Sequence, residues 1–196
     1  MEREGGRVAN QGYFIIIHES IYWIFHANSG FFKKDDNSIA SFPVSQLFPE
    51  GPELIDSSWN KDGNRILLYS KSENKIYAYD VIISNDPGRW IIPAKGFPKD
   101  LAISNTGSPK AIFQNKYSHV VLWKGEFYAE YDEVINVEFD VRLSNKLYAN
   151  IPANTTDAFY YDKIMYLVAD NKIHQYNIRT QEVIYSVKFD EFFRCV

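Results

Sequence analysis

The sequence predicts an all-β chain, folded as a small or incomplete β-propeller of four to five blades of short antiparallel strands. Three observations predict this fold. Aromatic residues make up 16% of the 196 residues, and aromatic and β-branched side chains favour pleated, half-buried surfaces. Short apolar runs alternate with turn signals along the chain. A sequence pattern typical of strand–turn–strand also recurs, and such repeats bury their apolar faces only by stacking on neighbouring repeats.

The sequence repeat is clearest in DSSWNKDGNRILLYSKSENKIYAYDV, residues 56–81, and LAISNTGSPKAIFQNKYSHVVLWK, residues 101–124. Superposing the two segments places Gly63 on Gly107. The apolar run 66–68 then falls on 110–112, and the run 76–79 falls on 120–123. Glycine tolerates the positive φ that tight turns require, so both glycines are expected in turns.

Each expected strand is an apolar run between turn residues, such as Asn28-Ser29-Gly30 and Lys124-Gly125. No window keeps a long 3.6-residue period, so no helix is expected. Trp59 and Trp123 occupy positions of the repeat where the fold requires a large side chain, and we expect both in the core. In chain order, the expected strands lie at 13–18, 21–26, 31–32, 66–68, 76–79, 90–92, 110–112, 120–123, 134–139, 146–150, 157–161, 164–168, 173–176 and 182–187.

The number of repeated units stays open between four and five. A spacing of about 40 residues per unit gives five units. If residues 134–151 form one extra hairpin instead, four units of roughly 49 residues remain, near the upper end of known blade lengths. No linker or low-complexity segment divides the chain, so either count fits a single domain over residues 1–196.

Charge and cysteine content narrow the class of protein. The net charge is −4 and no basic block stands out, which argues against direct binding of nucleic acid. Cys195 is the only cysteine, so no internal disulfide can form. No apolar run is long enough for a signal peptide or a membrane span. These features predict a cytoplasmic or nuclear protein.

No catalytic or metal-binding pattern stands out. The four histidines, His18, His26, His119 and His174, lack the spacing of metal ligands. We therefore expect no metal site, no cofactor and no enzymatic activity. An enzymatic alternative would use Glu126, Glu130 or Asp132 as acid or base, whereas capping of turns and solvation of strand ends is the expected role of such carboxylates.

Two known families resemble this chain. The segments 59–65 and 76–81, together with Ser104-Asn105-Thr106-Gly107 and the run 120–123, resemble the WD-repeat family over nearly the whole chain. This resemblance implies a non-enzymatic scaffold within a larger protein assembly. A WD-like chain of this length would form either an unusually small closed ring or an incomplete one. The unpaired strand edges of an incomplete ring would recruit another chain as an oligomer or a hetero-complex.

The second resemblance is to haemopexin-like four-bladed propellers. It rests on Asp56-Ser57-Ser58-Trp59, Asp157-Ala158-Phe159 and the run 127–132, and on the connectors Phe48-Pro49 and Phe97-Pro98. It implies a ligand- or ion-binding module whose central channel holds an ion through inward-facing backbone carbonyls. Cys195 stands where that family places a C-terminal cysteine, but the chain has no second cysteine to join it.

Candidate partner contacts follow from two unusual pairs of residues. Arg89-Trp90 follows a Pro-Gly turn, and an exposed Arg-Trp pair is typical of contact hot spots. Phe31 and Phe32 are adjacent in an expected strand, so their side chains point to opposite faces and one faces outward unless it is covered. Packing between blades is the alternative role for Trp90 and for both phenylalanines.

Overall fold

The computed structural model describes residues 7–8, 13–18, 21–26, 42–61, 64–82, 91–102, 106–115, 117, 119–161 and 164–193. These residues form four antiparallel sheets, three of four strands and one of five. Within each sheet the hydrogen-bonded order follows the chain, except that β9 (Lys99–Asp100) pairs with β7 (Lys75–Val81). Each sheet is therefore a meander whose first strand lies at one edge.

We number the sheets 1 to 4 along the chain. Sheet 1 holds β1 (Arg7–Val8), β2 (Tyr13–His18), β3 (Ile21–His26) and β4 (Phe42–Pro43). Sheet 2 holds β5 (Ser57–Lys61), β6 (Arg65–Ser70), β7 (Lys75–Val81), β8 (Ile91–Pro93) and β9 (Lys99–Asp100). Sheet 3 holds β10 (Ala111–Gln114), β11 (Val120–Trp123), β12 (Phe127–Asp132) and β13 (Val137–Leu143). Sheet 4 holds β14 (Thr155–Tyr161), β15 (Ile164–Ala169), β16 (Lys172–Asn177) and β17 (Glu182–Lys188).

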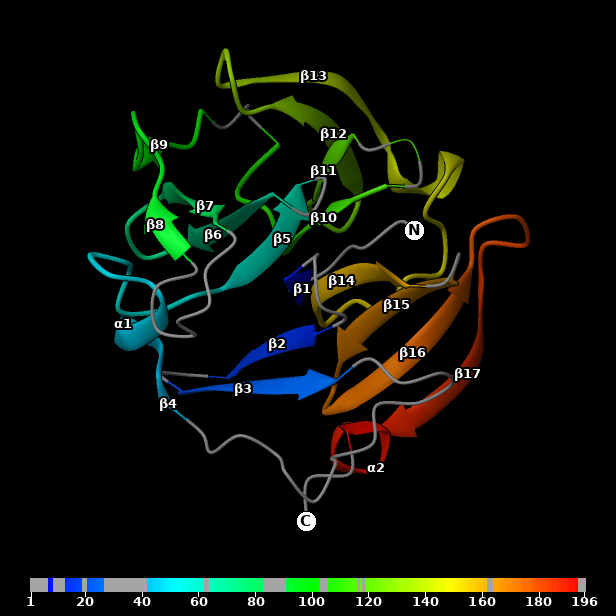
Figure 1. The fold of residues 1–196 in the computed structure, drawn as a ribbon. Coiled ribbons are helices and arrows are strands. Elements are labelled where there is room, and N and C mark those ends of the chain that lie inside the picture. Colours follow the sequence, from blue (N-terminus) through cyan, green and yellow to red (C-terminus); the bar gives the residue numbers. More distant parts are fainter. Residues whose placement is uncertain are drawn as a thin grey trace.

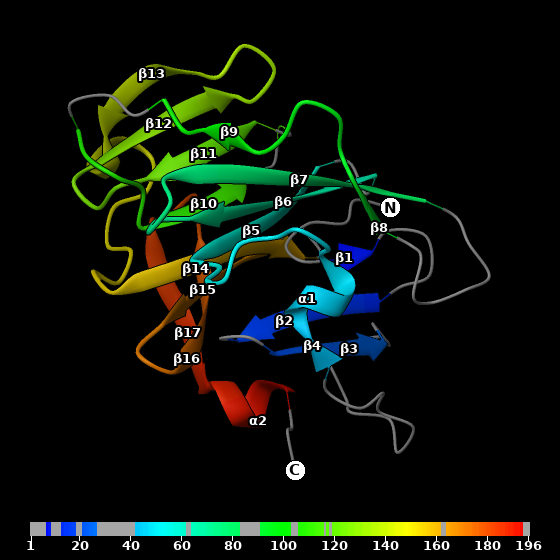
Figure 2. The same cartoon turned by 90° about the vertical axis from the view of Figure 1, so that its left-hand side faces the viewer.

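The first strands of sheets 2, 3 and 4 lie toward the middle of the molecule. Figures 1 and 2 show β5, β10 and β14 there, with β13 and β17 at the periphery. The helical elements are short: α1 (Val44–Leu47), a 3₁₀ turn (Ser144–Lys146) and α2 (Phe189–Phe193). In the described part of the chain, no helix is long and apolar enough to cross a membrane.

The core lies in layers between neighbouring sheets. Trp59 and Leu67 of sheet 2 pack in one cluster with Ile112 of sheet 3. Phe113, the next residue of β10, packs in the following cluster with Leu167 of sheet 4. Because successive residues of a strand point to opposite faces, β10 supplies both layers and all four of its residues are buried. The core positions expected for Trp59 and Trp123 are confirmed, since both side chains are buried.

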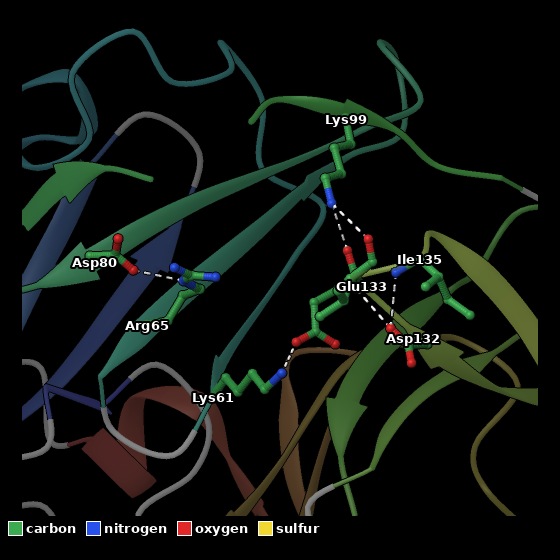
Figure 3. Close-up of polar contacts among 8 residues, drawn as sticks. Lys61, Arg65, Asp80, Lys99, Asp132, Glu133 and Ile135 are labelled. Carbon is green, nitrogen blue, oxygen red and sulfur yellow. Dashed lines mark hydrogen bonds and ion pairs between the residues drawn. The ribbon is translucent and has the colours of Figure 1, made fainter. Parts of the chain in front are cut away.

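Polar contacts tie sheet 3 to sheet 2 at the β12–β13 turn (Figure 3). Lys99 Nζ donates hydrogen bonds to the carbonyls of Glu133, at 2.9 Å, and Val134, at 3.2 Å. The Glu133 carboxylate forms an ion pair with Lys61. Asp132 Oδ1 accepts hydrogen bonds from the backbone N–H groups of Val134 and Ile135. The turn is thus fixed in position although Val134 and Ile135 expose their side chains.

The all-β antiparallel character is confirmed, and the described residues form four sheets rather than five. Gly107 and Gly125 adopt positive φ in turns as expected, whereas Gly63 lies outside the described residues. The expectation of no helix is wrong at α1 and α2. Elements of four and five residues are too short to show a helical period.

The expected register of the repeat is wrong by one strand. Residues 66–68 lie in β6, the second strand of sheet 2, whereas residues 110–112 lie at the first strand of sheet 3. Likewise, β7 is a third strand and β11 a second strand. Both pairs of segments are short and apolar, and the burial of each strand on both faces removes the alternation that would have fixed its place in the sheet.

Two expected strands in sheet 3 are also corrected. Residues 134 and 135 lie in a turn, because the Asp132 carboxylate holds their N–H groups and Asn136 adopts positive φ. The strand begins at Val137 instead. Residues 146–150 form the end of a 3₁₀ turn and a loop instead of a strand. From this loop, Tyr148 packs edge-on against Tyr128.

Candidate functional site

A single hydroxyl joins the first strands of sheets 2, 3 and 4. Ser57 begins β5 and is buried. Its Oγ lies 3.1 Å from the carbonyl oxygen of Ile112 on β10 and 3.1 Å from Asp157 Oδ1 on β14. We call these three residues the inner-strand junction. The segments that supply them lie 55 and 100 residues from Ser57 along the chain.

The junction satisfies the edge of β10. The N–H of Ile112 donates to Ser57 Oγ at 3.0 Å. The same hydroxyl has one proton, which it can give either to the Ile112 carbonyl or to Asp157. An edge strand presents backbone groups that need partners when they are buried. Ser57 supplies both a donor and an acceptor to that edge.

Asp157 reaches the junction from an irregular stretch of β14. The pairing of β14 with β15 shifts register between Thr155 and Asp157, and such a bulge redirects the side chains around it. Asp157 Oδ1 also accepts the N–H of Ala158 at 2.8 Å. Desolvation raises the pKa of Asp157 to about 7, although the hydrogen bonds from Ala158 and Ser57 lower it.

The junction gathers three kinds of oxygen, namely a carboxylate, a hydroxyl and a backbone carbonyl. Such oxygens are the ligands of hard cations such as Ca²⁺. Among the described residues, no group of three His, Cys, Asp or Glu side chains could hold a metal ion. A cation here would be held by Asp157, Ser57 and the Ile112 carbonyl, that is, by two side-chain oxygens and one backbone oxygen of the kinds that Ca²⁺ binds.

The residues predicted as partner contacts are not part of this site. Arg89, Trp90, Phe31 and Phe32 lie outside the described residues, so their role stays a prediction. Cys195 also lies outside them.

The histidines and carboxylates predicted from sequence are scattered. His119 Nδ1 lies 2.8 Å from Glu130 Oε2. The ring of His174 contacts Ser186 Oγ and the carbonyl of Ala169. Asp132 caps a turn, as expected for such carboxylates, and Glu126 lies just before β12 rather than in it. Glu130 and Asp132 lie two residues apart on β12, where Glu130 contacts His119 and Asp132 caps the turn.

Sequence reasoning did not single out the junction. Ser57 and Asp157 both occur in the segments that resemble haemopexin-like propellers, but nothing local indicates that their side chains meet. The sequence showed only that Ser57 and Asp157 are polar residues near the start of the first strand of two different sheets. Only the packing of the sheets turns that signal into a contact.

No protein-family model matches the chain, and no curated protein matches it. Solved structures do match. A hemopexin-fold protein from cow pea superposes with a TM-score of 0.72 at 15% identity, covering 96% of this chain and 93% of that one. A plant albumin from Cicer arietinum that shows hemagglutination superposes with a TM-score of 0.69 at 16% sequence identity. A plant lectin with two metal-binding sites, from the same species, superposes with a TM-score of 0.69 at 17% sequence identity. Both of these comparisons cover 96% of this chain and 93% of the other.

These matches correct the first of the two resemblances. The WD-repeat resemblance is wrong, because the solved structures that match nearly the full length of the chain are a hemopexin-fold protein and plant albumins and lectins rather than WD-repeat proteins. The expected WD-type propeller is likewise unsupported: within the described ranges, backbone pairing stays inside each of the four sheets and closes no ring. At this level of identity the likeness concerns the fold alone.

Proposed function

We propose that this protein is a non-enzymatic binding module of the hemopexin type, and that its inner-strand junction binds a hard cation such as Ca²⁺. The observation that carries the proposal is the convergence of the Asp157 carboxylate, the Ser57 hydroxyl and the Ile112 carbonyl. The similarity to the solved hemopexin-fold protein supports the module, and a plant lectin that also matches this chain is described as having two metal-binding sites.

The electrostatics of Asp157 favour a cation. Burial raises the pKa of its carboxyl group to about 7, so the ionised form is poorly stabilised by the protein alone. A bound cation would supply the missing opposite charge, and hard cations prefer carboxylate, hydroxyl and carbonyl oxygens. The ionised carboxylate and the cation would therefore stabilise each other at neutral and alkaline pH.

The proposal includes an arrangement of the four sheets around one axis. The first strands β5, β10 and β14 would line that axis, and β1 would complete the set as the first strand of sheet 1. Their inward backbone carbonyls would then add further oxygen ligands. A cation on the axis would contact several sheets at once and would stabilise their packing, because it binds the folded state and not the unfolded chain.

A protein-interaction scaffold is the weaker alternative. It rested on the WD-repeat resemblance, which the solved structures overturn. The non-enzymatic character of the module is part of our proposal, and it is supported by the role of Asp132 in capping the β12–β13 turn.

Isothermal titration with CaCl₂ at pH 8 tests the proposal. We expect one ion per chain to bind the wild-type protein, and we expect Asp157→Asn to weaken binding at least tenfold because it removes the only carboxylate of the junction. Ser57→Ala should weaken binding less, since it removes a neutral ligand.

Asp80→Asn is the matched control. Asp80 forms an exposed ion pair with Arg65, with 2.7 Å between Nε and Oδ1, and it lies on β7 rather than on a first strand. The proposal is contradicted if the wild-type protein binds no Ca²⁺. It is equally contradicted if Asp157→Asn binds Ca²⁺ as tightly as Asp80→Asn does.

A further inference from the structure

We propose that the outer part of sheet 3 carries a second, independent site that binds a sugar ring of a neutral glycan, formed by Tyr117, His119, Glu130 and Phe139. These four residues are named the aromatic–carboxylate patch. The patch uses none of the residues of the inner-strand junction, and its proposal does not depend on cation binding there.

Strand register places the patch residues together. Glu130 on β12 lies directly opposite Phe139 on β13, so their side chains share one face of the sheet. His119 precedes β11 and reaches the same face, with 2.8 Å between its Nδ1 and Glu130 Oε2. The ring of Tyr117 lies 6.4 Å from that of His119, centroid to centroid. The order across the sheet is Tyr117, His119, Glu130, Phe139.

Two aromatic side chains flank the polar pair and reach solvent. Tyr117 is 65% exposed and Phe139 is 45% exposed. Large aromatic side chains at a surface supply apolar contact area and specific ring geometry to a ligand. A pyranose ring has an apolar face of C–H groups and a rim of hydroxyls, so it matches aromatic faces beside hydrogen-bonding groups.

The polar pair suits a neutral ligand. The contact of His119 Nδ1 with Glu130 Oε2 fixes the ring and the carboxylate relative to each other. Because Nδ1 faces the carboxylate, the neutral imidazole presents Nε2 as an acceptor, while the carboxylate is itself an acceptor. Sugar hydroxyls can donate to both groups, and His119 is accessible because its side chain is 54% exposed.

The local backbone holds the patch in place before any ligand binds. Asn115 Oδ1 accepts hydrogen bonds from the N–H groups of Tyr117, at 2.9 Å, and His119, at 3.0 Å. The N–H of Asn115 in turn donates to the carbonyl of His119 at 2.8 Å. One side chain thus fixes the turn that presents both rings. Such preorganisation reduces the ordering cost of binding.

A printed array of neutral, acidic and amino-sugar glycans, probed with the fluorescently labelled full chain, tests the site. We expect binding to neutral glycans, with at least a tenfold loss of signal for Tyr117→Ala and for Glu130→Gln. Tyr185→Ala is the matched control, because Tyr185 is 48% exposed on the outer strand β17 of a different sheet, and it should bind as the wild type does. The midpoint of thermal unfolding of each variant confirms that it is folded.

Three results would overturn the inference. The first is no binding to any neutral glycan on the array. The second is binding that Tyr117→Ala and Glu130→Gln retain at the wild-type level. The third is retention on immobilised choline with no glycan binding, which would identify the patch as an aromatic site for cations. Because Asp157→Asn tests the junction by CaCl₂ titration and Tyr117→Ala and Glu130→Gln test the patch on the array, failure at one site is distinguishable from failure at the other.

Discussion

The first and the last long strands of sheet 3 lie in opposite surroundings. All four residues of β10 are buried, whereas every residue of β13 is exposed except Glu138, which is half-buried as a whole and has a buried side chain. The polar groups at the inner edge of β10 are satisfied by Ser57, from another sheet. At the outer edge, the bulged β13 relies on contacts within its own sheet, such as the ion pair of Arg142 with Asp140. Inner positions therefore join the sheets, and outer positions are left for the surface.

The largest expected effect contrasts an inner with an outer side chain. Trp59→Ala, on β5, should lower the free energy of unfolding by about 3–5 kcal/mol, because a fully buried aromatic leaves a cavity. Ile184→Ala, on the outer strand β17, should change it by less than about 0.5 kcal/mol, because Ile184 is mostly exposed. Urea denaturation measures both. Equal losses for the two variants would remove the distinction between inner and outer strands.

A buried ion pair gives the outer strand one strong attachment. Lys124 Nζ lies 2.6 Å from Glu138 Oε1, and the two side chains are only 0% and 3% exposed. Lys124→Met should cost about 3 kcal/mol, because it leaves the Glu138 carboxylate buried without its cation. The double variant Lys124→Met/Glu138→Leu should recover most of that loss in the same denaturation experiment. A double variant no more stable than Lys124→Met would show that the charge is not the cause.

Asp157 makes the inner junction sensitive to pH. Its folded-state pKa of about 7 lies above the value of an unfolded chain, so the folded protein holds the proton more tightly. The resulting stabilisation is complete below pH 4 and is lost as the pH rises toward 7, by about 2–4 kcal/mol. Denaturation with a chelator present, from pH 4 to 8, should show this loss in the wild type.

Asp157→Asn isolates that contribution, because an amide does not titrate. The variant should lack this loss and should be the more stable protein at pH 8 when no cation is present. Asp80→Asn should keep the wild-type pH profile. If the difference between wild type and Asp157→Asn is constant across the range, the carboxyl group does not titrate as described.

The sequence was informative where the physics is local. Aromatic content and turn signals predicted antiparallel sheets, Gly107 and Gly125 marked real turns, and the bulk of Trp59 and Trp123 marked the core. The place of a strand within its sheet was not local information. The runs 66–68 and 110–112 look alike, yet one is a second strand and the other a first strand.

The candidate sites required tertiary structure. Ser57 and Asp157 meet across 100 residues of chain, and their contact depends on how sheets 2 and 4 pack and on the bulge in β14. The sequence predicted a capping or solvated role for Glu130, with a role as acid or base as the alternative. Its contact with His119 depends on the β11–β12 register, and its position opposite Phe139 depends on the β12–β13 register. The turn at residues 132–136 sets the second register, and the sequence pattern began the following strand too early, at residue 134.

The most direct test of the central claim is a crystal structure of the protein grown at pH 8 with CaCl₂. We expect an ion at the inner-strand junction, with Asp157, Ser57 and the Ile112 carbonyl among its ligands at about 2.3–2.6 Å. Crystals of Asp157→Asn grown in the same way should lack it. A wild-type junction in which Ser57 still bridges Ile112 and Asp157 with no ion bound, or an ion held elsewhere by other residues, would contradict the account.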